Sequence, residues 1–168
     1  MIETTSLSSP VGHLHVGVRK GRLCVLELTG EPRFRRRLSR CGEPVEPARS
    51  PEAERILHAL RDYFAGDVRA LDAIEVDPLG GTAFQRRVWR ALRSIPPGTT
   101  VSYRTLARRV RAPKAMRAVG AANGANPVPI VLPCHRVIGA DGSLTGYGGG
   151  LARKRWLLEH EGLDLPAR

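Results

Sequence analysis

The chain has 168 residues, 42% of them hydrophobic, and its 27 Lys and Arg side chains against 16 Asp and Glu give a net charge of +11. This length suits one or two small domains with a proper core, and no apolar run approaches the roughly 20 residues of a membrane helix, so we expect no membrane partner. The arginine excess favours a polyanionic partner such as nucleic acid, although an arginine-rich proteome would give the same charge.

The cysteines and the start of the chain bear on its compartment. The three cysteines are odd in number and irregularly spaced, which argues against a disulfide framework. The first residues lack the basic and then apolar pattern of a signal peptide. We therefore expect a reduced, cytoplasmic protein, in which a reactive thiol would survive.

Residues 1 to about 76 have the pattern of a small α+β unit. The runs 13–18 and 23–28 are strand-like, and Lys20-Gly21 between them predicts a hairpin turn. After them, residues 31–47 are interpreted as a short helix followed by a loop.

A second helix of this unit is predicted from its ends. Ser50 is a suitable N-cap, Pro51 suits the first helical position, and Gly66 stops the helix. Residues 77–81 then have the composition of a linker.

Residues 82–168 are predicted to form a second domain that begins with three short helices. Thr82 and Ser102 act as N-caps of helices that run to about residues 94 and 111, and the pair forms a helix-turn-helix pattern. The third helix runs from Pro113 to about Asn123. Basic side chains are concentrated here: Arg104, Arg108, Arg109, Arg111, Lys114 and Arg117.

The third helix is unusual because glycine and alanine leave it almost without side-chain bulk. Helix propensity does not favour this composition, since Gly costs about 1 kcal/mol relative to Ala. A smooth surface would let the helix enter a narrow groove or pack closely against another backbone, and both interpretations stay open. Residues 145–150 follow as a flexible loop whose amides could approach a ligand closely, and a last helix runs from about 151 to 161.

The segment 130–138 places Cys134, His135 and Arg136 between two apolar stretches. Pro133 before them and β-branched residues after them predict a strand interrupted by a tight, rigid turn. A thiol is a good nucleophile as a thiolate, which cationic neighbours favour. Cys134 is therefore the candidate reactive centre; the alternative is a buried structural cysteine beside a surface His-Arg pair.

The motif Pro133-Cys134-His135-Arg136-Val137 resembles the signature of the O6-alkylguanine-DNA alkyltransferases, the methylated-DNA–protein-cysteine methyltransferases. The resemblance covers roughly residues 82–162, and the first half matches loosely, mainly in Ser9-Pro10-Val11-Gly12 and the following hairpin. The further matching segments are Arg117-Ala118-Val119-Gly120, Asn126-Pro127, Tyr147-Gly148-Gly149-Gly150 and Trp156 to Gly162.

The resemblance implies an α+β protein with a ribonuclease-H-like α/β domain (1–76), a linker (77–81) and a mostly helical domain (82–168) that carries the helix-turn-helix and the active-site cysteine. It implies direct, stoichiometric and irreversible transfer of an alkyl group from O6-alkylguanine in DNA to Cys134, with O4-alkylthymine as a further candidate substrate. The damaged nucleotide would be flipped out of the duplex. No cofactor is expected, and a monomer is expected on double-stranded DNA, with cooperative assembly left open.

The resemblance also implies the catalytic roles. His135 reaches the Cys134 sulfur through water and Glu161 orients the imidazole; direct contact is not expected, because neighbours on a strand point to opposite faces. Tyr103 helps to rotate the nucleotide and donates toward guanine N3, which offsets developing negative charge. Asn126 braces the turn before the active-site strand.

For the base, the resemblance implies that the main-chain carbonyls of Cys134 and Val137 accept from the guanine exocyclic amine. The backbone amide of Gly148, where relatives often have serine, donates to O6, with Gly149 beside it. Pro129 and Tyr147 wall the pocket.

For the DNA, Arg117 matches the finger that fills the vacated stack, and the small-residue helix matches a minor-groove recognition helix with Ala118, Ala121 and Gly124 on the duplex. Arg136 is also predicted to contact DNA. Some relatives have a zinc site in the first domain, but no CxxC pair exists here, so we predict no metal. The candidate ligands that fail to reproduce that site are His13, His15, Cys24 and Cys41.

Two alternatives remain at this stage. A non-catalytic alkyltransferase-like module would recognise the lesion without removing it, but such proteins carry another residue, commonly Trp, at the position of Cys134. A helix-turn-helix transcription regulator would read base edges in the major groove, which needs longer polar side chains than the small-residue helix offers.

Overall fold

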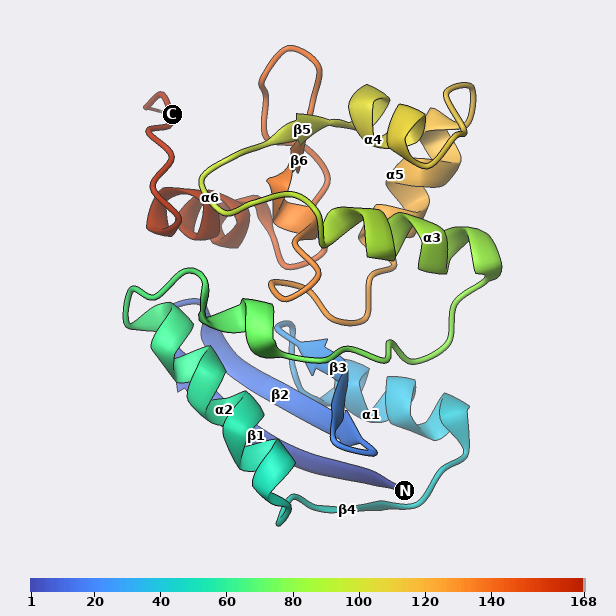
Figure 1. The fold of residues 1–168 in the computed structure, drawn as a ribbon, viewed down its shortest axis with the longest axis vertical. Coiled ribbons are helices and arrows are strands. Elements are labelled where there is room, and N and C mark those ends of the chain that lie inside the picture. Colours follow the sequence, from blue (N-terminus) through green and yellow to red (C-terminus); the bar gives the residue numbers. More distant parts are fainter. Residues whose placement is uncertain (168) are drawn as a thin grey trace. The chain divides into compact units, whose positions relative to one another are not determined.

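A four-stranded sheet organises the first eighty residues (Figure 1). The strands β1 (Ile2–Ser9), β2 (Gly12–Arg19) and β3 (Arg22–Glu27) run antiparallel to their neighbours, and β4 (Val45–Pro47) pairs parallel with β1, so the order is β3-β2-β1-β4. Between β2 and β3, Lys20 has φ 51° and Gly21 has φ 75°. Two positive φ angles in a two-residue loop match the twist of a hairpin, and the predicted hairpin is confirmed.

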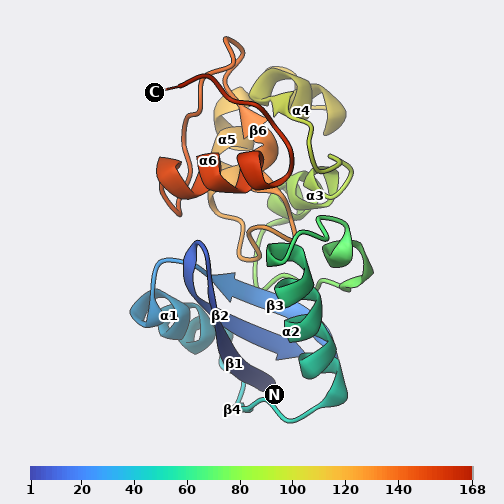
Figure 2. The ribbon, with the colours of Figure 1, turned by 90° about the vertical axis from the view of Figure 1, so that its left-hand side faces the viewer.

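Helices cover this sheet. Helix α1 (Glu31–Cys41) and helix α2 (Pro51–Phe64) lie on different faces of it (Figure 2). The α2 start follows the predicted chemistry, because the Ser50 side chain accepts from the amide of Ala53 at 3.2 Å. A short 3-10 helix, η1 (Ala70–Ala73), comes after α2.

The sequence interpretation missed two strands of this four-stranded sheet. β1 was not predicted, and the loop expected after α1 contains β4. All three β4 residues are exposed, so its sequence has no alternation of buried and exposed residues to mark a strand. Its pairing with β1 depends on partners 43 positions away, such as Thr4 with Pro47.

The second unit begins at Gly81 and is mostly helical. It contains α3 (Ala83–Leu92), α4 (Tyr103–Arg109), α5 (Met116–Gly124), α6 (Leu151–His160), a 3-10 turn η2 (Cys134–Arg136) and a parallel pair of two-residue strands, β5 (Val101–Ser102) and β6 (Val137–Ile138). The predicted caps of α3 and α4 are confirmed: Thr82 forms a capping box with Gln85, and Ser102 accepts from Thr105. Helix α5 starts three residues later than Pro113.

The core of this unit brings α3 against α5. The Trp89 indole is 3% exposed and its Nε1 donates to the carbonyl of Ala122 at 2.8 Å. On α3, Val88 and Leu92 are fully buried, and so is Val119 on α5. Helix α5 is thereby held against α3 by its inner face.

The computed structural model describes residues 1–167, and the last residue of the predicted second domain, Arg168, lies outside them. The predicted α+β class is confirmed. The ribonuclease-H-like label of the first domain stays a prediction. Within the described residues, no helix has the length and apolar character needed to cross a membrane.

Candidate active site

Cys134 lies on a 3-10 turn, not on a strand. The turn spans Cys134–Arg136 and leads directly into β6, while residues 130–132 before it form turns and a bend. The predicted strand before Pro133 is therefore wrong. Ile130 has φ 73° and is buried, a backbone conformation that costs a β-branched residue on the order of 1–3 kcal/mol, which suits a fixed turn and excludes a regular strand.

Asn126 holds the segment that leads to this turn. Its Nδ2 donates to the carbonyl of Leu132 at 2.7 Å, and its Oδ1 accepts from the amide of Val128 at 2.9 Å. The side chain is 5% exposed, so these bonds are shielded from water and replace backbone pairing that the irregular segment lacks. The geometry agrees with the bracing role expected for Asn126.

The Cys134 thiol is buried and protonated at neutral pH. Burial raises the pKa of Cys134 to about 11, against the opposing effects of a hydrogen bond from Asn126 and the positive charge of Lys154. The sequence suggested that the side-chain charges of His135 and Arg136 favour the thiolate, but the charge that lowers the pKa of Cys134 is that of Lys154, and His135 contributes through a backbone hydrogen bond. A base has to remove the proton before the sulfur can act as a nucleophile.

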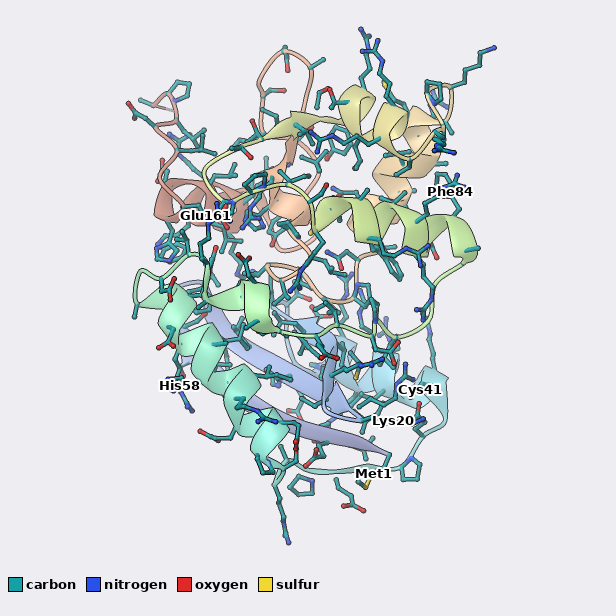
Figure 3. All side chains as sticks on the ribbon, in the orientation of Figure 1. Met1, Lys20, Cys41, His58, Phe84 and Glu161 are labelled. Carbon is teal, nitrogen blue, oxygen red and sulfur yellow. The ribbon has the colours of Figure 1, made fainter. Side chains whose placement is uncertain are left out.

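His135 is hydrogen-bonded to Glu161. Glu161 follows the last residue of α6 (Figure 3). His135 Nε2 lies 2.7 Å from Glu161 Oε1, and both side chains are fully buried. The other ring nitrogen, Nδ1, is buried and has no hydrogen-bond partner among the described residues. If Nε2 carries the ring proton, Nδ1 presents a lone pair that can accept another.

Arg136 lies inside the unit and does not face a partner. Its Nε and NH2 groups donate to the two oxygens of Glu161, each at 2.8 Å, and NH1 donates to the carbonyl of Ile95 at 2.5 Å. All three directions of the guanidinium fork are used, and the residue is 6% exposed. The predicted contact of Arg136 with DNA is therefore corrected: Arg136 is a buried partner of Glu161.

This ion pair fixes the charge of Glu161. Burial raises the pKa of Glu161, but hydrogen bonds and charges from His135 and Arg136 outweigh it and lower the pKa to about 2. Burial lowers the pKa of His135, against the opposing effect of Glu161. At neutral pH the carboxylate is ionised and the ring is neutral, which is the state in which a histidine can act as a base.

Tyr103, at the start of α4, connects to the glycine-rich loop. Its hydroxyl donates to the carbonyl of Thr145 at 3.2 Å and lies 3.4 Å from that of Gly146. Burial raises the pKa of Tyr103, with the Cys134 charge acting in the same direction and hydrogen bonds from Thr145 and Asn123 opposing it. The phenol is therefore protonated at neutral pH and can donate.

The residues predicted to surround the flipped guanine lie on β6, on the segment before the cysteine turn and in the glycine-rich loop. Val137 is fully buried at the start of β6, and its carbonyl accepts from Lys154 at 2.6 Å. Pro129 and Tyr147 are half-buried, and Gly148 and Gly149 lie in the loop with exposed and half-buried backbone.

Two polar residues of the site were missed by sequence reasoning. Asn123 is 2% exposed and its Nδ2 lies 3.4 Å from the carbonyl of Cys134. Lys154 is fully buried on α6. Within Arg153-Lys154-Arg155 it had no signal to set it apart from a solvated basic run.

The small residues of α5 lie at the surface. Arg117, Ala118, Ala121 and Gly124 are all exposed, whereas Val119 is buried. A Cβ atom added at Gly124 would meet nothing within 4 Å. Close internal packing therefore does not account for the exposed small residues, and of the two interpretations left open by the sequence, a smooth outer surface fits. Within residues 1–167, no three His, Cys, Asp or Glu side chains are placed to hold a metal ion.

The second unit matches a known protein family. Residues 83–163 match the family model for the 6-O-methylguanine DNA methyltransferase, DNA binding domain. The methylated-DNA–protein-cysteine methyltransferase of Salmonella typhimurium is 60% identical over 106 residues, which are 63% of this chain and 61% of that protein. The match thus spans less than two thirds of that relative's length.

Other relatives match along the whole chain. The methylated-DNA–protein-cysteine methyltransferase of Mycolicibacterium paratuberculosis is 49% identical over 170 residues, covering 99% of this chain and 96% of that protein. A crystal structure of Mycobacterium tuberculosis OGT in complex with DNA has a TM-score of 0.78 and 42% identity, covering 95% of this chain and 92% of that one. The resemblance drawn from the Pro-Cys-His-Arg motif is confirmed, and the chain belongs to the methylated-DNA–protein-cysteine methyltransferase family.

Proposed function

We propose that this protein repairs DNA by moving an alkyl group from O6-alkylguanine to the sulfur of Cys134, once per molecule and irreversibly. The observation that carries the proposal is a buried thiol, Cys134, followed directly by a buried histidine that is hydrogen-bonded to Glu161. The His135 imidazole is in its neutral state. A nucleophile, a base and a group that orients the base are the parts that alkyl transfer to a thiol needs. Membership of the family supports the same reaction.

The step balances without a cofactor. His135 Nδ1 takes the thiol proton, directly or through one water molecule, and the ionised Glu161 stabilises the imidazolium that results. The sulfur then attacks the alkyl carbon, an S–C bond forms, and the C–O6 bond breaks with its electron pair left on the guanine. The Tyr103 hydroxyl offsets this charge by donating toward N3. The thioether is stable, so the protein is consumed.

The base-binding part of the proposal uses the backbone around the turn. The carbonyls of Cys134 and Val137 accept from the exocyclic amine, the Gly148 amide donates to O6, and Pro129 and Tyr147 flank the ring. Val137 leads from the same turn as the thiol. Such an arrangement would hold the alkyl carbon near the sulfur, which lowers the entropy cost of reaction.

Double-stranded DNA is the proposed partner, bound through its minor groove by α5. The exposed small residues let the helix approach the floor of a groove about 6 Å wide, and exposed Arg117 would fill the stack after the nucleotide flips. Exposed arginines on α4, such as Arg104 and Arg108, add attraction to the phosphates.

The finer features of the proposal are a monomer in the free state and a cytoplasmic location. The three cysteines are free, which suits a reducing compartment. The non-catalytic and transcription-regulator alternatives are less well supported, because a buried cysteine–histidine–glutamate arrangement serves neither of them.

Mass spectrometry tests the proposal. The protein is incubated with a duplex that contains one O6-methylguanine, and the Cys134 peptide should gain one methyl group, in a 1:1 ratio to repaired base and without turnover. A Cys134→Ser variant should gain none but still bind the duplex, whereas Cys24→Ser, a change of another buried cysteine, should be modified like the wild type. Repaired DNA beside an unmodified Cys134 peptide would refute the proposal.

A further inference from the structure

Lys154 is a buried cation that takes part in none of the proposed reaction steps. It is 0% exposed, although it is the fourth residue of α6 and lies between two arginines that reach the surface in part. Among the described residues it forms no ion pair with a carboxylate. A buried charge without a counter-ion is costly, so its presence here suggests a function.

The ammonium group of Lys154 joins two segments of the site. Its Nζ donates to the carbonyl of Val137 at 2.6 Å and to the carbonyl of Thr145 at 2.8 Å. Val137 follows the cysteine turn, and Thr145 begins the glycine-rich loop and also accepts from the Tyr103 hydroxyl. One side chain therefore holds the active-site strand, the loop and, through Thr145, the phenol in a common arrangement.

The same ammonium acts on the thiol through its charge. Burial lowers the pKa of Lys154 to about 8, and its charge lowers the pKa of Cys134. Four other titratable groups belong to the elements packed around the thiol: His135, Arg136, Glu161 and Tyr103. The ring and the phenol are neutral at pH 7, and the guanidinium is compensated by the carboxylate, so the charge of Lys154 is left without compensation until the thiolate forms.

We propose that Lys154 is a positioning residue for alkyl transfer, which holds the segments of Val137 and Thr145 together and provides the positive charge against which the Cys134 thiolate forms. This inference rests on the proposed function. Lys154 keeps its proton throughout: the thiol proton goes to His135, the S–C bond forms, and the electron pair of the broken C–O6 bond stays on guanine. The lysine changes the free energy of the thiolate and transfers nothing itself.

Three substitutions separate charge from hydrogen bonding. Lys154→Arg keeps the charge, Lys154→Gln keeps hydrogen-bond donors without the charge, and Lys154→Met removes both. Lys20→Met is the matched control, because Lys20 is exposed in the β2–β3 turn of the other unit and its loss removes the same charge. If Lys154→Met fails to fold by circular dichroism, Lys154→Gln carries the test.

Two measurements are made on each full-length variant. The first is the single-turnover rate with free O6-benzylguanine at pH 7, and the second is the pH profile of Cys134 alkylation by iodoacetamide, read by mass spectrometry of the Cys134 peptide. Lys154→Gln and Lys154→Met should be at least 10-fold slower and should shift the profile to higher pH by about one unit. Lys154→Arg should keep the wild-type profile, and Lys20→Met should match the wild type in both.

An unchanged pH profile in Lys154→Gln and Lys154→Met would overturn the inference even if their rates fell, because that pattern describes a purely structural lysine. A profile shifted equally in Lys154→Arg would overturn it too, since the charge would not matter. The iodoacetamide profile requires no DNA and no alkylguanine. Failure of the proposed function would appear separately, as wild-type protein that takes no methyl group from the O6-methylguanine duplex.

Discussion

The Nε2 atom of His135 lies 2.7 Å from Oε1 of Glu161, with both side chains fully buried. Because Glu161 is ionised, it can only accept this hydrogen bond, so Nε2 carries the ring proton and Nδ1 is left as the acceptor. The pair therefore selects the tautomer that a base needs. Arg136 contributes by donating to both oxygens of the same carboxylate, which keeps the acid ionised in a buried site.

Glu161→Gln should slow alkyl transfer strongly. An amide does not stabilise the imidazolium as a carboxylate does, so we expect a loss on the order of 100-fold or more in the single-turnover rate with O6-benzylguanine. The substitution also leaves Arg136 buried without a counter-ion, which should cost about 3–5 kcal/mol in the free energy of unfolding.

The control for this variant is Glu159→Gln on the same helix. Glu159 is 47% exposed and pairs with Arg155 at the surface, so its loss should change both quantities little. A folded Glu161→Gln protein that reacts at the wild-type rate would contradict the assigned tautomer.

Acid should weaken the fold through Glu161. Its pKa is lowered from 4.5 to about 2 in the folded protein, so the unfolded chain binds the proton first as the pH falls. The stabilisation is complete above pH 4.5, is lost progressively as the pH falls below it, and is gone near pH 2. Its size is on the order of 3 kcal/mol.

Urea denaturation at pH 6, 4, 3 and 2.5 measures this effect as the difference between wild type and Glu161→Gln. The difference should shrink as the pH falls, since the variant lacks the group that titrates. A difference that stays constant over this range would mean that Glu161 has an ordinary pKa.

Local chemistry made much of the fold predictable from the sequence. Ser50, Thr82 and Ser102 were identified as N-caps, and each accepts a backbone amide at the start of its helix. Lys20-Gly21 specified its hairpin because the required positive φ angles are a property of the turn itself. By contrast, β4 has three exposed residues and forms only because β1 is available beside it.

The family of the chain could be predicted from the sequence more readily than the packing of the candidate site. The Pro-Cys-His-Arg motif indicated the family and the candidate thiol, but neighbouring positions do not reveal which side chains are buried. Arg136 was expected at the DNA and is paired with Glu161, 25 positions later. Lys154 was not singled out, and it is fully buried with its ammonium on the carbonyl of Val137. Both cases concern long basic side chains, whose partners are set by tertiary packing.

Asn126→Ala should destabilise the second unit more than Asn123→Ala. Both amides are almost fully buried, but Asn126 satisfies two backbone groups at 2.7 and 2.9 Å. The Nδ2 of Asn123 lies 3.4 Å from its one backbone partner, the carbonyl of Cys134, and its Oδ1 has no partner among the described residues. We expect a loss of about 2–4 kcal/mol for Asn126→Ala and a clearly smaller one for Asn123→Ala. Thermal or urea unfolding of the two variants checks the order, and equal losses would remove the bracing role from Asn126.

Arg117→Ala should separate DNA handling from chemistry. Arg117 is exposed on α5, so its removal should change the free energy of unfolding by less than about 0.5 kcal/mol. If its side chain fills the vacated stack, transfer from an O6-methylguanine duplex should slow at least 10-fold, because unstacking costs a few kcal/mol that the finger offsets. Reaction with free O6-benzylguanine needs no flipping, so its rate should stay at the wild-type value.

The control is Arg55→Ala, which removes an exposed arginine on α2 and should affect neither reaction. Equal losses on duplex and free base in Arg117→Ala would place the residue in the chemistry and would end its assignment as the finger.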